Sequence, residues 1–575
     1  MKRVVKCAGV LCLVILLVGG FVPVIAENNQ TRLPPQELRD FCYEQLWDVL
    51  LHPTNADNNR KRQDMLHQLA ELLSKVGYSV EQVIPSRHDL MILMNQKEPD
   101  QVYELIDDGI LESCLLIRDP ISIQTKITID CARITGSIKD FRQVNDGIFY
   151  PKRDSKGKSS ETIDLSGKMK ELSMQSIRTH DAYGMTDPVT NKIICGLDMH
   201  YLYPDTTKDP FDPASYQFDI MDSWIKKIDE IGAKVFFRVG ESWDIHPEPP
   251  KNVDNYVQAV VQILKHYHQG WANGYYYHIP YWEIWNEPAL KVFWTGTADQ
   301  FIQLYAKIAI ALKKEDPTIQ VGGPGNAGNF QKDWYYQFFA YIREHNLPFD
   351  FYSWHWYGIR PYEVAAIARD VQKDLESFGF YQTKQLITEW NIDVWGSIEG
   401  KKVGNNRDRG NQFFNSMFNA AFHGCVLTHL QDSPVMMAHH YRGDINGFGL
   451  LDESSNFNRV GLFYQNLSEI MSCPTRLYVT SNPIQESFTC LAGSSLDQRN
   501  IQLLISDARI GNNPYNLELI NSKKSDRMKL TIHRLQPDGS MKIVQEMDLA
   551  ASQKITIPLE MQAPTIDRIV ISLIP

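Results

Sequence analysis

The sequence predicts an α/β protein with a parallel (β/α)8 barrel, a C-terminal β-sandwich and a small helical N-terminal extension. Short apolar segments alternate with helical patterns over residues 140–472, and strand-like alternation without helices fills 473–575. Leucines at helical spacing within 36–77 mark the helical extension at 27–112. The length of 575 residues also exceeds what one hydrophobic core normally organises, so several domains are expected.

Residues 1–26 have the pattern of a secretory signal peptide. Lys2, Arg3 and Lys6 precede an apolar run over 8–24 that ends in small residues. We therefore expect cleavage and a secreted protein, extracellular or periplasmic, without membrane association afterwards. An uncleaved anchor is the alternative, but the run is short for a bilayer span.

The composition is that of an ordinary globular protein, with 43% hydrophobic and 22% charged residues. A net charge of −11 disfavours nucleic acid or an anionic membrane as the main partner. Seven cysteines follow the signal, an odd number without CxxC spacing, which argues against a zinc site or a dense disulfide framework. Cys114 and Cys131 could pair, but the sequence determines neither this connectivity nor an oligomeric state.

The N-terminal extension precedes a single predicted strand. Residues 36–77 form two amphipathic patterns separated by "HPTNADNNR", which indicates a packing appendage to which we assign no chemistry. Within 113–139, the stretch 121–134 alternates apolar and polar residues like a half-buried strand. We expect this segment to join the C-terminal sandwich.

Helix and strand patterns then alternate as a (β/α)8 barrel requires. Residues 220–231 place their apolar side chains on one helical face ahead of the buried strand "AKVFFRVG". Thr297 and Gln300 form a capping box before another apolar stripe and the strand "IQVGG". The candidate barrel strands are 142–149, 174–180, 234–239, 281–286, 319–323, 350–356, 386–390 and 434–440.

Four further strands are expected in the C-terminal domain. They are "MKLTIHRL", "MKIVQEM", "KITIPL" and "RIVISLI", and the turn "QPDGS" separates the first two. This series predicts a small β-sandwich.

Two acidic residues end barrel strands, where the active sites of such barrels lie. Glu287, in "YWEIWNEPAL", ends the fourth strand, and Glu389, in "LITEWNID", ends the seventh. Two carboxyl groups in one cleft suit the hydrolysis of a glycosidic bond. Each acid alone has a structural alternative: Asn286 could cap a helix with Glu287 in its first turn, and Glu389 could start a helix or form a salt bridge.

The motifs "WEIWNEPAL" and "LITEWN" resemble the acid/base and nucleophile motifs of clan A glycoside hydrolases, and most of all those of family 39, which includes β-xylosidases and α-L-iduronidases. "SIRTHD" resembles the second-strand Arg-x-His of that family, and "FDFYSWHWYG" its sixth-strand His-x-Tyr. The resemblance covers about 140–465.

This resemblance implies a retaining mechanism, with Glu287 as acid and then base and Glu389 as nucleophile. The carboxyl groups should then stand only about 5 Å apart. Glu287 must start protonated, and we expect the charge of Glu389 to raise its pKa. The resemblance also implies sugar contacts from His180, Asn286, His355 and Tyr357, with Asn286 on the 2-hydroxyl.

Neighbouring side chains support this site in ways that the residues leave partly open. Arg178 lies on the same strand face as His180, where it could orient Glu389 through a buried ion pair or touch sugar. His180 and His355 could instead be satisfied structural histidines. Aromatic faces for sugar rings are expected from Trp282, Trp285, Trp354, Trp356, Tyr357 and Trp390, with Trp282 and Trp354 also serving the core.

The eighth strand departs from the family pattern, because "MMAHHYRGD" replaces a Trp-rich segment. Arg442 with His439 and His440 could meet the carboxylate of a uronic acid or could be structural. Adjacent strand residues face opposite ways, so a metal site is not expected. A long segment after the second strand, from "DAYGM" to "TTKDP", could close one end of the cleft and favour exo action.

Together these features predict a secreted, retaining O-glycoside hydrolase that needs no cofactor. Its substrate would be an oligo- or polysaccharide, cleaved by exo action with β-xylosidase-like or uronidase-like specificity. The alternatives are a non-catalytic carbohydrate-binding surface scaffold and a clan A endo-glycanase.

Overall fold

The computed structural model describes residues 125–574, except 154–158, 182, 187–192, 243–245, 329–330, 359, 393–413, 446, 483–485, 522–526 and 551. All of the described residues belong to one compact unit made of Pro120–Val394 and Asn406–Pro575. The expected signal peptide at 1–26, the helical extension at 27–112 and Cys114 lie outside the described residues.

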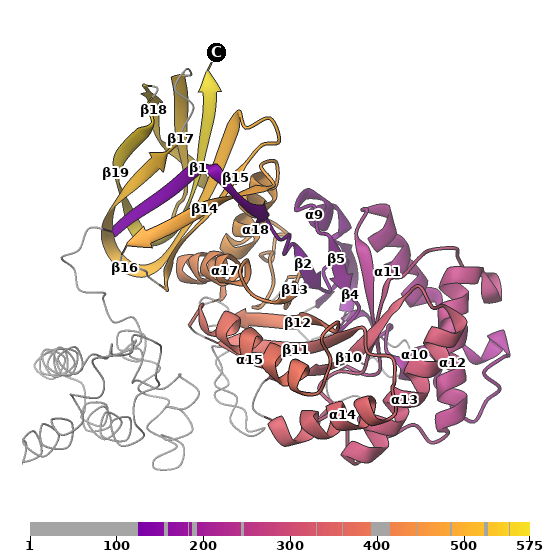
Figure 1. Cartoon of the computed structure of the whole chain (residues 1–575). Coiled ribbons are helices and arrows are strands. Elements are labelled where there is room, and N and C mark those ends of the chain that lie inside the picture. Colours follow the sequence, from indigo (N-terminus) through magenta and orange to yellow (C-terminus); the bar gives the residue numbers. More distant parts are fainter. Residues whose placement is uncertain are drawn as a thin grey trace, which may run out of the picture. The chain divides into compact units, whose positions relative to one another are not determined.

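Eight parallel strands close into a barrel, which confirms the predicted fold class (Figure 1). Around the barrel the order is β10-β11-β12-β13-β2-β5-β8-β9, so the chain runs once around the ring in sequence order. Each strand overlaps a segment predicted from the sequence. The bounds are β2 (Gln143–Asn145), β5 (Ser176–Arg178), β8 (Lys234–Val239), β9 (Tyr281–Ile284), β10 (Gln320–Asn326), β11 (Phe351–Gly358), β12 (Lys384–Ile392) and β13 (Val435–His440).

Helices connect these strands, and most of the longer ones have one apolar face. The capping box at Thr297 forms as predicted: Gln300 N donates to Thr297 Oγ1 at 3.2 Å, and Thr297 N donates to Gln300 Oε1 at 2.9 Å. The helices are α9 (Ser166–Glu171), α10 (Met199–Leu202), α11 (Asp219–Glu230), α12 (Val253–Gln269), α13 (Ala298–Glu315), α14 (Lys332–Glu344), α15 (Glu363–Ser377), α17 (Met417–Leu430) and α18 (Arg459–Ile470), with 3-10 turns η1 (Pro213–Ser215) and η2 (Trp271–Asn273). Among these described elements, none has the length and apolar character needed to cross a membrane.

Two excursions leave the barrel after its first two strands. The first contains the hairpin of β3 (Phe149–Arg153) and β4 (Ser159–Asp164), so the predicted strand 142–149 is divided between β2 and β3. The second contains the hairpin of β6 (Tyr183–Thr186) and β7 (Ile193–Cys195). Contacts between β3 and β6 join the two excursions.

The barrel interior changes character along its axis. At the N-terminal ends of the strands, Phe236, Phe351, Leu386 and Met437 form a buried apolar cluster. Further along, His439 contacts Ser176 Oγ at 3.2 Å, and at the C-terminal ends the inward residues are ionisable. The apolar layer therefore closes the base, and the chemistry is confined to the other end.

A seven-stranded sheet follows, with strand order β1-β14-β15-β16-β19-β17-β18. β1 pairs antiparallel with β14 and parallel with β16, so a segment that precedes the barrel completes the sheet that follows it. Leu503, Leu517, Leu530 and Ile569 belong to its buried core. The strands are β1 (Thr125–Ser137), β14 (Thr475–Asn482), β15 (Phe488–Ser494), β16 (Asn500–Ile520), β17 (Arg527–Leu535), β18 (Met541–Leu549) and β19 (Lys554–Ile574).

The division of the last segment into two strands is wrong. "KITIPL" and "RIVISLI" belong to the single strand β19, which pairs antiparallel with β16 along almost its whole length. The polar and proline-containing middle resembles a break in the sequence, but it pairs with residues 511–515 of β16 beyond a bulge. Cys131 in β1 is a free thiol among the described residues, and its pairing with Cys114 stays a prediction because Cys114 lies outside them.

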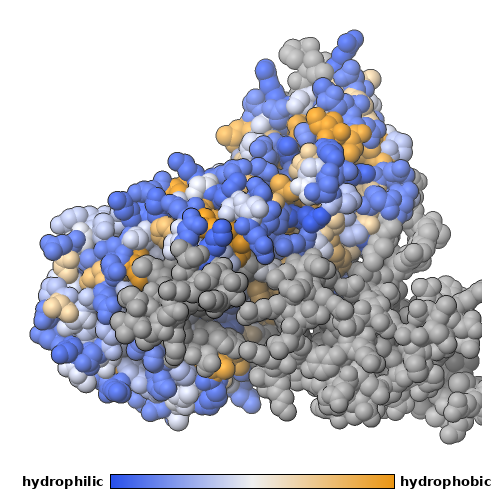
Figure 2. Space-filling view, turned by 180° about the vertical axis from the view of Figure 1, so that it is seen from behind, coloured by the Kyte–Doolittle hydropathy of each residue, from blue (hydrophilic) through white to orange (hydrophobic). Residues whose placement is uncertain are grey.

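The described part of the exterior is mainly hydrophilic (Figure 2). Hydrophilic residues dominate the described part of one face, and apolar residues occur there in small scattered groups (Figure 2). Such scattered apolar residues are normal for a soluble protein surface and mark no interface by themselves.

Candidate active site

Glu287 and Glu389 meet at the C-terminal end of the barrel. Glu389 lies within β12, and Glu287 follows β9 in a turn where it adopts φ 45° and donates its N–H to Gly325 O at 2.9 Å. One oxygen of each carboxyl group and Nδ1 of His355 all lie within 4.8 Å of one another. The structure thus brings together the two acids that the sequence selected from different strands.

Arg178 organises the centre of this site. Its side chain is fully buried, and Nη1 donates to Glu389 Oε1 at 2.8 Å. Nε donates to Glu283 Oε2 at 2.6 Å, and Nη2 donates to Asn286 Oδ1 at 2.7 Å. A second amide oxygen, Oδ1 of Asn145, accepts from Nη1 at 3.0 Å. Of the two roles considered for Arg178, the structure shows the buried ion pair that orients Glu389.

Three further groups surround the carboxyl oxygens. Tyr357 donates its hydroxyl to Glu389 Oε2 at 3.0 Å. His355 Nδ1 lies 2.7 Å from Glu287 Oε1 and 3.5 Å from Glu389 Oε2, so it bridges the pair. His180 Nε2 lies 3.2 Å from Glu389 Oε1. Glu389 therefore has more hydrogen-bonding partners than Glu287 has.

These environments shift the pKa values of both acids. Burial raises the pKa of Glu287 to about 8, and the charge of Asp181 adds to this against the opposing effect of Arg178. Burial also raises the pKa of Glu389, while His355 and Arg178 oppose that change. The repulsion between the two carboxyl groups raises the pKa of Glu389, and our expectation that the charge of Glu389 raises the pKa of Glu287 stays a prediction.

The two histidines are neutral at physiological pH in this setting. Burial lowers the pKa of His355 to about 4 and that of His180 well below its usual value, and Arg178 contributes in both cases. Neutral imidazoles add no positive charge that would compete with Arg178 for the carboxyl groups. In each neutral ring one nitrogen donates a hydrogen bond and the other accepts one, and the tautomer decides which.

The side-chain amide of Asn286 uses its oxygen, but not its nitrogen, in a hydrogen bond to a described residue. Oδ1 accepts from Arg178, whereas Nδ2 has no hydrogen-bond partner among the described residues. An unsatisfied amide donor next to both acids is consistent with the sugar contact implied for Asn286.

The prediction that Trp390 offers an aromatic face to a sugar ring is wrong. Successive strand residues face opposite sides, so Trp390 points outward when Glu389 points inward. Its fully buried ring packs against His423 of α17 and against His440, and Nε1 donates to Ala438 O at 3.3 Å. The other tryptophans named for this purpose, Trp282, Trp285, Trp354 and Trp356, are at most 5% exposed.

The structure also decides between the alternatives for the eighth strand. Arg442 is buried and forms ion pairs with Asp444 and Asp146, so its charge is already balanced by two carboxyl groups. His439 points into the barrel beside Phe236, and His440 contacts His423 on the outer side. The structural interpretation holds, and the interpretation that this group meets the carboxylate of a uronic acid does not.

Sequence reasoning missed two acidic residues, Glu283 and Asp181. Glu283 lies in β9 at 0% exposure and shares Arg178 with Glu389. Asp181 follows His180 in "SIRTHD" and accepts from Tyr441 Oη at 2.6 Å. A buried acid in the middle of an apolar strand was the available signal for Glu283, and proximity to a predicted strand end was the signal for Asp181.

Two described groups have the donor atoms of a metal site. Glu287, His355 and Glu389 form one, but the Arg178 guanidinium 2.8 Å from Glu389 would repel a cation there. His268, His278 and Asp316 form the other. His268 already uses both ring nitrogens, because Nε2 accepts from Ile279 N at 2.9 Å and Nδ1 contacts Asp316 at 3.0 Å.

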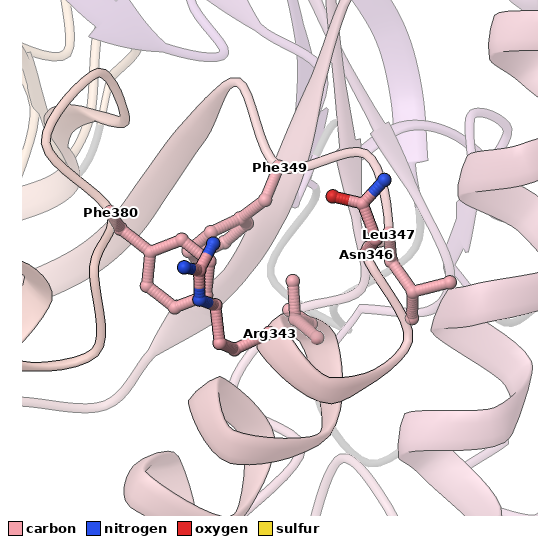
Figure 3. A pocket seen from close by; sticks show the side chains of 6 residues that line it. Arg343, Asn346, Leu347, Phe349 and Phe380 are labelled. Carbon is pink, nitrogen blue, oxygen red and sulfur yellow. The ribbon is translucent and has the colours of Figure 1, made fainter.

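A small cavity of about 140 Å³ lies at the opposite end of the barrel (Figure 3). It is bounded by the end of α14 and by the segments that lead into β11 and β12. Its lining residues are Ile342, Arg343, Asn346, Leu347, Phe349 and Phe380. Because active sites of such barrels lie at the C-terminal ends of the strands, this cavity is not assigned to the chemistry.

Comparison with known proteins agrees with this architecture. The family model described as "Glycosyl hydrolases family 39" matches residues 125–441, more than half of the chain. A β-xylosidase of Caldicellulosiruptor saccharolyticus is 28% identical over 207 residues, which are 31% of this chain and 41% of that relative. The chain thus matches less than half of the length of this relative.

Solved structures share the fold over most of the described chain. A glucosidase from Croceicoccus marinus has a TM-score of 0.63 at 23% identity, covering 79% of this chain and 100% of that one. A monomeric β-xylosidase from Caulobacter crescentus CB15 has a TM-score of 0.56 at 18% identity, covering 78% and 99%. At such identities the likeness establishes the fold alone.

Proposed function

Because the chain belongs to glycosyl hydrolase family 39, we propose that it is a retaining, exo-acting, β-xylosidase-like glycoside hydrolase. The observation that carries the mechanism is the approach of Glu287 and Glu389, whose oxygens lie within 4.8 Å of each other. Retaining glycosidases hold their carboxyl groups about 5–5.5 Å apart, whereas inverting enzymes need about 6.5–9.5 Å to admit a water between them.

In the first step Glu389 attacks the anomeric carbon while Glu287 gives its proton to the departing glycosidic oxygen. The bond from sugar to leaving group breaks, and a glycosyl ester of Glu389 forms. In the second step Glu287 removes a proton from water, which attacks the same carbon and releases Glu389. Two inversions leave the configuration of the sugar unchanged.

The surroundings support these opposite roles. Arg178 and Tyr357 both donate to Glu389, which favours its ionised, nucleophilic form. Glu287 has a pKa raised to about 8, so it holds its proton at neutral pH. Once Glu389 is esterified, its negative charge is lost, and Arg178 then favours the ionised form of Glu287 that acts as base.

Exo action and secretion complete the proposal. The excursion between β5 and β8 carries a hairpin and α10 beside the C-terminal end of the barrel, which supports a cleft closed at one end. The signal-like residues 1–26 support export, and processing there is testable by N-terminal sequencing of protein recovered outside the cell. The residues of this mechanism need no cofactor.

The test is hydrolysis of aryl β-xyloside, β-glucoside and α-L-arabinofuranoside, with the first-formed anomer followed by NMR. We expect retention, and Glu389→Gln should lower kcat by at least about 10⁴-fold while the protein stays folded. Azide should partly restore turnover in Glu287→Ala, because it attacks the glycosyl ester without a base. Glu376→Gln on the exposed face of α15 is the matched control. Inversion, or full activity of Glu389→Gln, would overturn the mechanism.

A further inference from the structure

Asp181 is a third acidic side chain at the candidate active site, and the proposed mechanism does not use it. It follows β5 directly after His180, and its side chain is 6% exposed. His180 Nε2 lies 3.7 Å from Asp181 Oδ1 and 3.2 Å from Glu389 Oε1, so the two acids flank the same nitrogen. A sugar positioned at Glu389 is therefore within reach of Asp181.

The two carboxyl oxygens of Asp181 differ in their contacts. Oδ2 accepts a short hydrogen bond of 2.6 Å from the hydroxyl of Tyr441. Oδ1 is buried and has no hydrogen-bond partner among the residues that the structure describes. A buried acceptor without a donor is costly, and such a group in a cleft has a use when a ligand supplies the missing donor.

Side chains of residues that follow two other strands hold Asp181 in place. Its N–H donates to Ser242 Oγ at 3.3 Å after β8, and its side chain is tied to Tyr441 after β13. It adopts φ 52°, a left-handed conformation that Asp tolerates better than most residues do. The free oxygen is thus presented by a fixed support, as sugar recognition requires.

The charge balance around Asp181 is negative. Three buried arginines lie near Asp181, and each is already paired: Arg178 with Glu283 and Glu389, Arg442 with Asp146 and Asp444, and Arg238 with Asp198. Burial raises the pKa of Asp146 well above its usual value. Together with Asp181, the carboxyl groups of this region outnumber its guanidinium groups.

From this arrangement we infer that Asp181 determines sugar specificity: Oδ1 accepts a hydrogen bond from a hydroxyl of a neutral sugar, and the carboxylate excludes uronic acids. Hydrogen bonds to a charged acceptor are the stronger kind, which favours a hydroxyl donor at this place. A uronate would bring another negative charge into a buried region whose cations are already paired. This inference rests on the proposed glycosidase function and names its substrate class.

The test compares wild type and Asp181→Asn on 4-nitrophenyl β-D-xyloside, β-D-glucoside and β-D-glucuronide. The wild type should prefer a neutral glycoside by at least about 10³-fold in kcat/KM. Asp181→Asn should lower kcat/KM for that substrate by about 10- to 100-fold, since a charge-assisted hydrogen bond is lost. The preference over the glucuronide should shrink by at least about 100-fold, which a purely structural role of Asp181 would not produce.

Asp254→Asn is the matched control, because this aspartate is 82% exposed and pairs with Lys307 on the outside of the barrel. Thermal shifts with xylose, glucose and glucuronate give a second readout that needs no turnover. Stabilisation of the wild type by a neutral sugar but not by glucuronate supports the inference even if hydrolysis fails. Equal response to glucuronate, or an equal loss on all substrates in Asp181→Asn, would overturn it.

Discussion

The two ends of the barrel interior are built from the same strands and differ completely in chemistry. Along β11 the inward residues are Phe351 at the base, then Ser353, His355 and Tyr357. Phe351 joins an apolar cluster, whereas His355 and Tyr357 contact the two acids. An apolar layer gains stability from burial alone, but an ionisable layer must satisfy every charge it buries. This protein therefore obtains stability at one end of the barrel and places its chemistry at the other.

Removing Arg178 should have the largest effect, because it breaks the ionisable layer at its centre. Arg178→Met leaves Glu283 and Glu389 buried without their cation, which should lower the free energy of unfolding by about 3–5 kcal/mol. Displacement of Glu389 should lower kcat by at least about 100-fold. Denaturant unfolding and kinetics on the best aryl glycoside measure both.

Arg178→Lys keeps the charge but cannot contact Glu283, Asn286 and Glu389 at once, so it tests the geometry if the methionine variant fails to fold. Wild-type activity in Arg178→Lys would mean that the ionisable layer needs only a positive charge.

Phe351→Ala should affect stability strongly and chemistry weakly. Truncation leaves a cavity in the apolar layer, with an expected loss of about 3–5 kcal/mol in the free energy of unfolding. Because the acids lie at the other end of the strand, kcat of the folded protein should stay within about threefold. A loss of kcat in the fully folded variant would show that the two layers are coupled and would contradict this prediction.

The pH dependence of kcat/KM should show a smaller effect, which also distinguishes the ionisable layer from the apolar one. Glu287 has a pKa raised to about 8 by burial and must be protonated to act as acid, so kcat/KM should fall above about pH 8. Profiles from pH 5 to 10 measure this limb. Phe351→Ala should leave it in place, whereas Asp181→Asn should move it to lower pH, because the charge of Asp181 helps to raise the pKa. A basic limb near pH 5 would contradict the assignment of Glu287.

Most of the barrel could be predicted because its signals are local. Each strand is a short apolar run, each helix repeats with a period of about 3.6 residues, and Thr297 with Gln300 marks a helix start within four residues. The long strand β19 could not be predicted as one element. Its polar middle is stabilised by pairing with β16, a partner more than 40 residues away in the chain.

The site shows the same division. Glu287 and Glu389 could be selected because strand ends are visible in the sequence and barrel geometry gathers them at one face. The roles of Trp390 and Arg442 could not, since each depends on what lies beside it. Trp390 packs against α17. Arg442 pairs with Asp146, which lies near the start of the barrel in the sequence, whereas Arg442 lies near its end.

The sequence by itself determined the fold class and the two acids, because periodicity and strand ends are properties of neighbouring residues. Only the tertiary structure decided which charges are paired and which remain available. Arg178, Glu283 and Glu389 come from three strands, and the unpartnered oxygen of Asp181 is recognised only when its neighbours are in place. Electrostatic interactions depend on distance and burial in space, and a sequence records neither.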